Sequence, residues 1–168
     1  DPPRVPHDDN PTGLYRTRFR VPAEWKDRAV FLRFDGVQSA YYVWLNGKKL
    51  GYREDAFTPG EFDLTHHLVP GDNVLAVEVL HHSDGSYLED QDYWRLAGIF
   101  RDVSLVAPPK VRLRDFTVRT DLDAAYRDAT RELRVALENR SKAPASGHLV
   151  TASVLDAAGA EVFRAKLA

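Results

Sequence analysis

Residues 41–52 read YYVWLNGKKLGY, and they contain the strongest secondary-structure signal of the chain. Two runs of strand-forming residues flank Asn46-Gly47. An Asn-Gly connection is typical of a tight β-hairpin, because both residues tolerate positive φ. The stretch therefore predicts two antiparallel strands, and it favours a fold built from strands.

Strand periodicity continues on both sides of this hairpin. In LYRTRFRV, residues 14–21, the side chains alternate with the two-residue period of a half-buried strand. In NVLAVEVL, residues 73–80, both faces are largely apolar, which predicts a strand in the interior of a sandwich. Further extended segments are expected at residues 29–36, 61–68 and 99–107. The fold class predicted from these patterns is all-β.

The pair Pro108-Pro109 marks an expected domain boundary, because neither residue donates a backbone hydrogen bond and both stiffen the chain. Residues 108–168 then contain four strand candidates. An immunoglobulin-like sandwich needs about seven strands and about 100 residues, so this second domain is expected to be partial; a small four-stranded domain is the alternative. Residues 122–133 have a weak helical repeat, but their place between two strands favours a hairpin connection.

The composition excludes several classes of function. The chain has 168 residues, a formal net charge of -2 and a pI near 6.3, so it lacks the basic footprint that nucleic acid requires. It has neither an apolar run of about 20 residues nor a signal peptide, so we expect a soluble protein without a membrane partner, cytoplasmic by default. The lack of cysteine excludes disulfides and thiolate sites. The lack of methionine, even at position 1, suggests an interior piece of a longer polypeptide.

One stretch departs from the strand pattern: DGSYLEDQDYWRLAGIFRD, residues 84–102, which we call the acidic stretch. A solvated loop is the simplest interpretation. However, Tyr87, Tyr93 and Trp94 are interleaved with the acids. Sugar sites combine rings, which stack on apolar sugar faces, with fixed polar partners for the hydroxyls. The composition therefore also fits a sugar site.

The carboxylates of this stretch allow three further interpretations. Asp90 and Asp92 would have Cβ atoms about 6.6 Å apart on an extended chain, whereas a retaining glycosidase needs carboxyl groups about 5 to 5.5 Å apart in an enclosed cleft. Hard cations such as Ca²⁺, Mg²⁺ or an alkali ion suit these oxygens and the Gln91 amide, but the spacing does not match a Ca²⁺ loop. Structural ion pairs would join Arg95 or Arg101 to Glu89 or Asp90.

A second candidate site is HDDNPTGLY, residues 7–15. Asn10-Pro11 favours an ordered turn, which is a sufficient structural role by itself. The same turn would hold the Asn10 amide, with two donors and an acceptor, toward a hydroxyl-rich ligand.

Three motifs together resemble the amino-terminal sugar-binding domain of the large β-galactosidases of glycoside hydrolase family 2: NPTGLYRTRF, LRFDGVQSAYYVWLNGKKLGY and SDGSYLEDQDYWRLAGIFRDVSL. The resemblance implies a jelly-roll β-sandwich for residues 1–107 and a partial immunoglobulin-like β-sandwich for residues 108–168. It implies that the parent chain continues into a (β/α)₈ barrel that holds both catalytic glutamates, hydrolyses terminal β-D-galactosides such as lactose, and assembles as a homo-oligomer.

The same resemblance implies the site residues. Asn10 and Asp92 would contact galactosyl hydroxyls, and Asp92 would also ligate a sodium ion, with magnesium bound elsewhere in the parent. A carboxylate suits both tasks, because it accepts from a hydroxyl and ligates a hard cation. Residues with a supporting role would be Glu89, Asp90, Trp94 and Arg95. Residues that depart from the usual family pattern, and so bear on sugar preference, are His81, His82 and Tyr93.

The function predicted from the sequence is thus a non-catalytic part of a β-galactosidase, inactive by itself, that lends binding residues to the barrel of the same parent chain. A free-standing carbohydrate-binding module is one alternative. Another is the sandwich of a related enzyme of the β-glucuronidase or β-mannosidase type. A third is a sandwich that only braces a catalytic domain.

Overall fold

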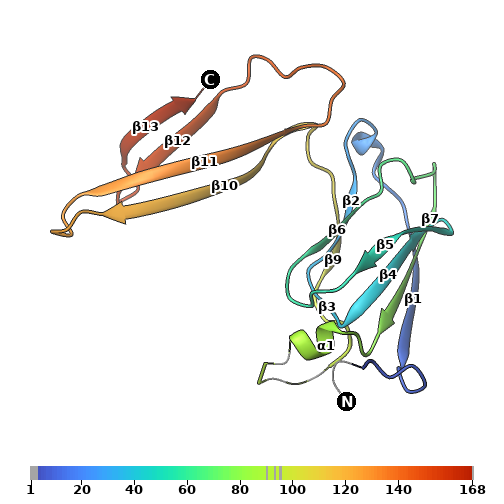
Figure 1. Ribbon diagram of the computed structural model, residues 1–168. Helices are drawn as coiled ribbons and strands as arrows, with labels where there is room; N and C mark the ends of the chain where they lie inside the picture. The colour runs from blue at the N-terminus through green and yellow to red at the C-terminus, as the bar shows by residue number, and fades with distance from the viewer. Residues whose placement is uncertain (1–3, 90, 93, 95, 168) are drawn as a thin grey trace. The chain divides into compact units, whose positions relative to one another are not determined.

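The computed structural model describes residues 4–89, 91, 92, 94 and 96–167, and the chain forms two compact units (Figure 1). Unit 1 is Asp1–Pro109 and unit 2 is Lys110–Ala168. The division follows the Pro-Pro pair, next to the predicted boundary. In the part of the chain that the structure describes, no helix has the length and apolar character needed to cross a membrane.

Unit 1 is the predicted β-sandwich, and its paired strands are antiparallel. The larger sheet has the order β1-β7-β4-β5, with β1 (Thr12–Phe19), β7 (Asn73–Leu80), β4 (Ala40–Leu45) and β5 (Lys48–Arg53). The smaller sheet has the order β6-β2-β9, with β6 (Gly60–Asp63), β2 (Phe31–Phe34) and β9 (Val103–Val106). The remaining elements are the pair β3 (Val37–Gln38) and β8 (Gly98–Ile99), the 3₁₀ turn η1 (Ala23–Trp25) and the helix α1 (Gly85–Leu88).

The turn between β4 and β5 confirms the predicted hairpin. Asn46 and Gly47 have φ values of 51° and 80°, which an Asn-Gly pair adopts at low cost. The Asn46 amide nitrogen donates to the carbonyl of His67 and to Oδ1 of Asn73, while its oxygen accepts from the backbone nitrogen of Val74. Asn46 therefore fixes both the turn and the position of the hairpin against β7.

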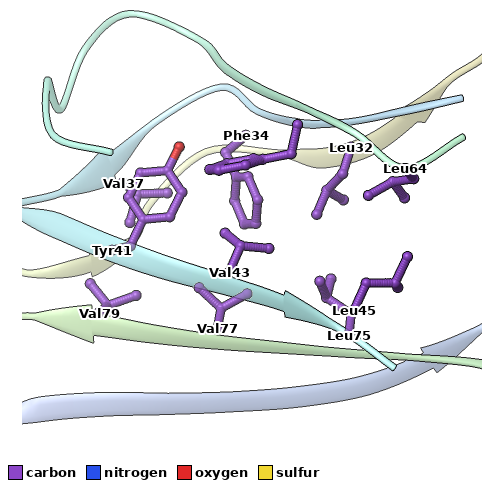
Figure 2. Packing of buried hydrophobic residues seen from close by; sticks show 11 residues of the cluster. Leu32, Phe34, Val37, Tyr41, Val43, Leu45, Leu64, Leu75, Val77 and Val79 are labelled. Atoms are coloured by element: carbon purple, nitrogen blue, oxygen red, sulfur yellow. The ribbon is translucent and has the colours of Figure 1, made fainter. Parts of the chain in front are cut away.

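The core of unit 1 lies between the two sheets (Figure 2). Inward side chains alternate along β4 and β7, as the two-residue period of a strand requires. The buried cluster consists of Leu32, Phe34, Val37, Tyr41, Val43, Leu45, Phe62, Leu64, Leu75, Val77 and Val79. The ring of Phe34 packs against those of Tyr41 and Phe62, with centroids 5.0 and 6.0 Å apart. Burial raises the pKa of Tyr41 to about 12, so this core hydroxyl is neutral at physiological pH.

The strand predicted at residues 99–107 is interrupted. Ile99 ends β8 and Val103 begins β9. Between them, the backbone nitrogen of Phe100 donates to the carbonyl of Gly36 (3.3 Å), and that of Asp35 donates to the carbonyl of Asp102 (3.0 Å). The alternating pattern continues through the break because an apolar side chain from each half, such as Ile99, packs against the core.

Unit 2 consists of two hairpins. One pairs β10 (Val111–Leu122) with β11 (Ala129–Asn139), and the other pairs β12 (Val150–Leu155) with β13 (Glu161–Leu167). In the turn after β10, the Asp123 carboxylate accepts from the backbone nitrogen of Arg127 at 2.8 Å. The predicted hairpin connection is therefore confirmed, and the helical alternative for residues 122–133 is wrong.

The apolar side chains of unit 2 remain largely open. Phe116 and Phe163 are 61% and 60% exposed. A hollow of about 560 Å³ receives side chains from both hairpins, among them Val118, Leu133 and Val154. The unit thus has strands with an apolar face but no closed core within the described residues.

Candidate functional site

The acidic stretch begins where β7 ends. It opens with helix α1, which the sequence does not predict. The backbone nitrogen of Ser83 donates to Oγ of Ser86 at 3.1 Å, and the Tyr87 hydroxyl donates to the carbonyl of Arg4 at 2.9 Å. The first contact is local to the helix start, and the second holds the stretch against the amino-terminal segment.

Asn10 lies at the same end of the β1/β7 pair. Its Nδ2 donates to the carbonyl of His82 at 2.9 Å, and its Oδ1 accepts from the backbone nitrogen of His82 at 2.8 Å. This two-bond clamp continues the pairing of Thr12 with Leu80 beyond the strand ends. Within the described part of the chain, this half-buried amide has no further partner for its second Nδ2 hydrogen and its second Oδ1 lone pair.

Asp92 is exposed in the acidic stretch, and Trp94 is 85% exposed. The supporting role that the resemblance implies for Trp94 stays a prediction. The other candidates in this segment, Asp90, Tyr93 and Arg95, lie outside the described residues. Asp92 is therefore exposed to solvent. Asn10 is held against His82, which lies two residues before the acidic stretch.

Three carboxylates gather where α1 meets the end of β5, a cluster that the sequence did not reveal: Glu54, Asp84 and Glu89, which we call the acidic cluster. Burial is the largest cause that raises the pKa of Glu54. A hydrogen bond from Tyr52 opposes this shift, whereas a hydrogen bond with Asp84 and the charges of Asp84 and Glu89 reinforce it. Glu54 therefore binds a proton more readily than an ordinary glutamate. The one local sign of this cluster in the sequence is that Glu54 directly follows the hairpin strand β5.

A small hollow of about 200 Å³ adjoins the Asn10 turn. Its lining residues are Pro11, Thr12, Gly13, Tyr15, Val79, His81, Ala97 and Gly98. Glycine keeps it open, because a Cβ at Gly98 would lie 3.3 Å from the Tyr15 hydroxyl. Ligand pockets usually have about 300 to 1,000 Å³, so the hollow is at most part of a site.

The donors of the acidic stretch fit a hard cation only in part. Asp92 and the Gln91 amide present oxygens of the type that alkali ions prefer, and Asp92 is exposed. Among the residues that the structure describes, no group of three or more His, Asp or Glu side chains is placed to hold a metal ion. A sodium ion at Asp92 would need further ligands from another part of the protein.

Comparison with known proteins gives one family and one group of relatives. Residues 1–109 match the family model described as "Glycosyl hydrolases family 2, sugar binding domain". A beta-galactosidase of Priestia megaterium is 45% identical over 99% of this chain, and one of Aeromonas hydrophila is 53% identical over 82% of it. The chain spans only 16% and 13% of the lengths of these two relatives.

Solved structures agree on the fold. A beta-glycosidase from Bacteroides vulgatus superposes with a TM-score of 0.72 at 28% identity, over 92% of this chain and 19% of its own. A beta-glucuronidase from Bifidobacterium dentium, complexed with coumarin-3-O-glucuronide, superposes with a TM-score of 0.72 at 26% identity, over 91% of this chain and 30% of its own.

Proposed function

Because the chain belongs to the sugar-binding domains of the family 2 glycosyl hydrolases, we propose that it completes the sugar site of a β-galactosidase. In this proposal Asn10 and Asp92 contact the hydroxyls of a galactosyl group. The bond between sugar and aglycone is cleaved by groups in another part of the same parent chain.

The observation that carries the proposal is the Asn10 clamp. It fixes the amide against His82 at 2.9 and 2.8 Å. The side chain of Asn10 is therefore already ordered before a ligand arrives, and binding loses little of its conformational entropy. The remaining hydrogen and lone pair can then serve one sugar hydroxyl as donor and acceptor. The exposed Asp92 carboxylate, on the stretch that follows His82, adds an acceptor for another hydroxyl.

The choice of galactoside follows the relatives. Proteins named beta-galactosidase share 45% and 53% identity with the chain, against 26% for the beta-glucuronidase from Bifidobacterium dentium.

Asp92 is also the residue we propose to hold a sodium ion, because its two oxygens allow one to ligate the cation while the other accepts from a hydroxyl. When bound, the ion would supply a fixed positive charge that orients sugar oxygens. The chain's own contribution is the placement of the Asp92 carboxylate.

Kinetics of the parent enzyme test the proposal. We expect β-galactosides to be preferred over β-glucuronides and β-mannosides. We expect Asp92→Ala to raise the KM for a β-galactoside about 10- to 100-fold, since a hydrogen bond to a charged group contributes about 1.5–3 kcal/mol. Glu24→Ala, which removes an exposed acid from η1, is the matched control and should leave KM unchanged. A preference for glucuronides would overturn the substrate, and an unchanged KM in Asp92→Ala would overturn the binding role.

A further inference from the structure

We propose that Arg101 is a positioning residue for Asp92, and that it acts by fixing the segment that carries Asp92 to the turn at residues 54–58. We call these residues the anchor turn. The inference rests on the proposed role of Asp92 in sugar binding and adds a residue that has no contact with the sugar itself.

The anchor turn is held in one conformation by its own side chains. Asp55 has a φ of 77°, a left-handed value that a non-glycine residue keeps only when its surroundings support it. Its carboxylate accepts from both the hydroxyl and the backbone nitrogen of Thr58. The Thr58 hydroxyl is the first cause that lowers the pKa of Asp55, so the charged form is the one that locks the turn.

The front end of the Asp92 segment is fixed to this turn by Glu89. Both carboxylate oxygens of Glu89 lie close to the backbone nitrogen of Ala56, at 3.3 and 3.2 Å. Ala56 is fully buried, so this donor has no access to bulk water and depends on a protein acceptor. Glu89 is also the C-cap residue that follows helix α1, so the contact lies where the chain leaves the helix.

Arg101 fixes the carboxyl-terminal end of the Asp92 segment to Phe57, the residue after Ala56 in the anchor turn. Its Nη1 donates to the carbonyl of Phe57 at 3.0 Å and to that of Asp35 at 3.3 Å. The guanidinium also lies over two rings, with its carbon 5.6 Å from the centroid of Phe57 and 5.3 Å from that of Phe100. Cation–π contact and two carbonyl acceptors together define one orientation of this side chain.

Arg101 is exposed, but one side of it and of Phe100 packs closely against Gly36. A Cβ at Gly36 would lie 2.8 Å from Cζ of Phe100 and 2.9 Å from Cδ of Arg101. Glu89 and Arg101 thus contact consecutive residues of the anchor turn, Ala56 and Phe57. In the sequence, Asp92 lies between Glu89 and Arg101. Closing a segment at both ends on a rigid turn restricts the positions open to its side chains.

Kinetics of the full-length parent test this role. We expect Arg101→Ala to raise the KM for a β-galactoside about tenfold, with a smaller change in kcat, because misplacing a binding group by about 1 Å costs up to a hundredfold. Arg101→Lys keeps the charge but loses the planar stacking, so its KM should rise less. Arg20→Ala, which removes an exposed ion pair with Asp72, is the matched control and should change neither constant.

The double variant separates positioning from general support. If Arg101 acts through Asp92, adding Arg101→Ala to Asp92→Ala should raise KM no further. An equal rise in both backgrounds would overturn the inference, as would an unchanged KM in Arg101→Ala and Arg101→Lys when Asp92→Ala alone raises it. An unchanged KM in Asp92→Ala would instead refute the proposed function, and the positioning role with it. Arg101→Lys decides the matter if Arg101→Ala does not fold.

Discussion

The two units of the chain contain the same kind of alternating strand but differ in what covers the apolar face. In unit 1, Phe34 and Val43 are 1% and 0% exposed because a second sheet faces the first. In unit 2, Phe116 and Phe163 also lie in paired strands, yet they are 61% and 60% exposed. The pattern within a strand shows which face is apolar, but the facing sheet decides whether that face is buried.

The largest expected difference between the two units is in the stability cost of removing one phenylalanine ring from each. Phe34→Ala should cost about 3–5 kcal/mol in the free energy of unfolding of unit 1, because it leaves a cavity in a closed core. Phe116→Ala should cost less than about 1 kcal/mol, as a mainly exposed side chain does. Amide hydrogen exchange reports each unit separately. Similar costs in both units would show that unit 2 buries its rings as unit 1 does.

Replacing a small residue by a larger one in each unit should also change their stabilities by different amounts. A Cβ at Gly60 would collide with the buried hydroxyl of Tyr41, so Gly60→Ala should destabilise unit 1 by about 1–3 kcal/mol. Ala152 lines the open hollow of unit 2, and Ala152→Val should change stability by no more than about 0.5 kcal/mol. The cost at Gly60 should shrink in a Tyr41→Phe background; if it does not, the collision is not its cause.

The smallest expected effect is the opposite pH dependence of two glutamates. The pKa of Glu54 in unit 1 is raised, first by burial. Its contribution to stability is present below the pKa of the unfolded chain and is lost as pH rises through the higher folded value. The pKa of Glu138 in unit 2 is lowered, first by its hydrogen bond from Arg112. Its contribution is present above the unfolded pKa and is lost as pH falls through the lower folded value.

Glutamine variants measure these two signs. Glu54→Gln should stabilise unit 1 more at about pH 7.5 than at about pH 4, and Glu138→Gln should destabilise unit 2 more at about pH 7.5 than at about pH 4. Hydrogen exchange at the two pH values provides both numbers. The same sign for both variants would contradict the account of these carboxyl groups.

Much of the fold could be predicted because its signals are local. Asn46-Gly47 set the turn of the β4-β5 hairpin, and the apolar run of β7 marked a buried strand. Helix α1 escaped prediction because its four residues depend on distant partners, such as the Arg4 carbonyl that accepts from Tyr87. The break between β8 and β9 escaped because apolar alternation continues across it.

The site shows the same limit. Asn10 was a candidate from its turn and from the family resemblance, but the partner of its amide is His82, 72 positions away. Glu54 and Asp84 are joined by a hydrogen bond only because the end of β5 meets the start of α1. The importance of Asn10 could be predicted, whereas its long-range partner and the approach of Glu54 to Asp84 could not.

The most direct test of the central claim is a sodium titration of the parent enzyme with a β-galactoside, in wild type and in Asp92→Ala. If this sandwich completes the sugar site, sodium lowers the KM of the wild type, and Asp92→Ala has a raised KM that sodium no longer changes. An Asp92→Ala enzyme with the KM and the sodium response of the wild type would contradict the claim, and the acidic stretch would then be a structural element only.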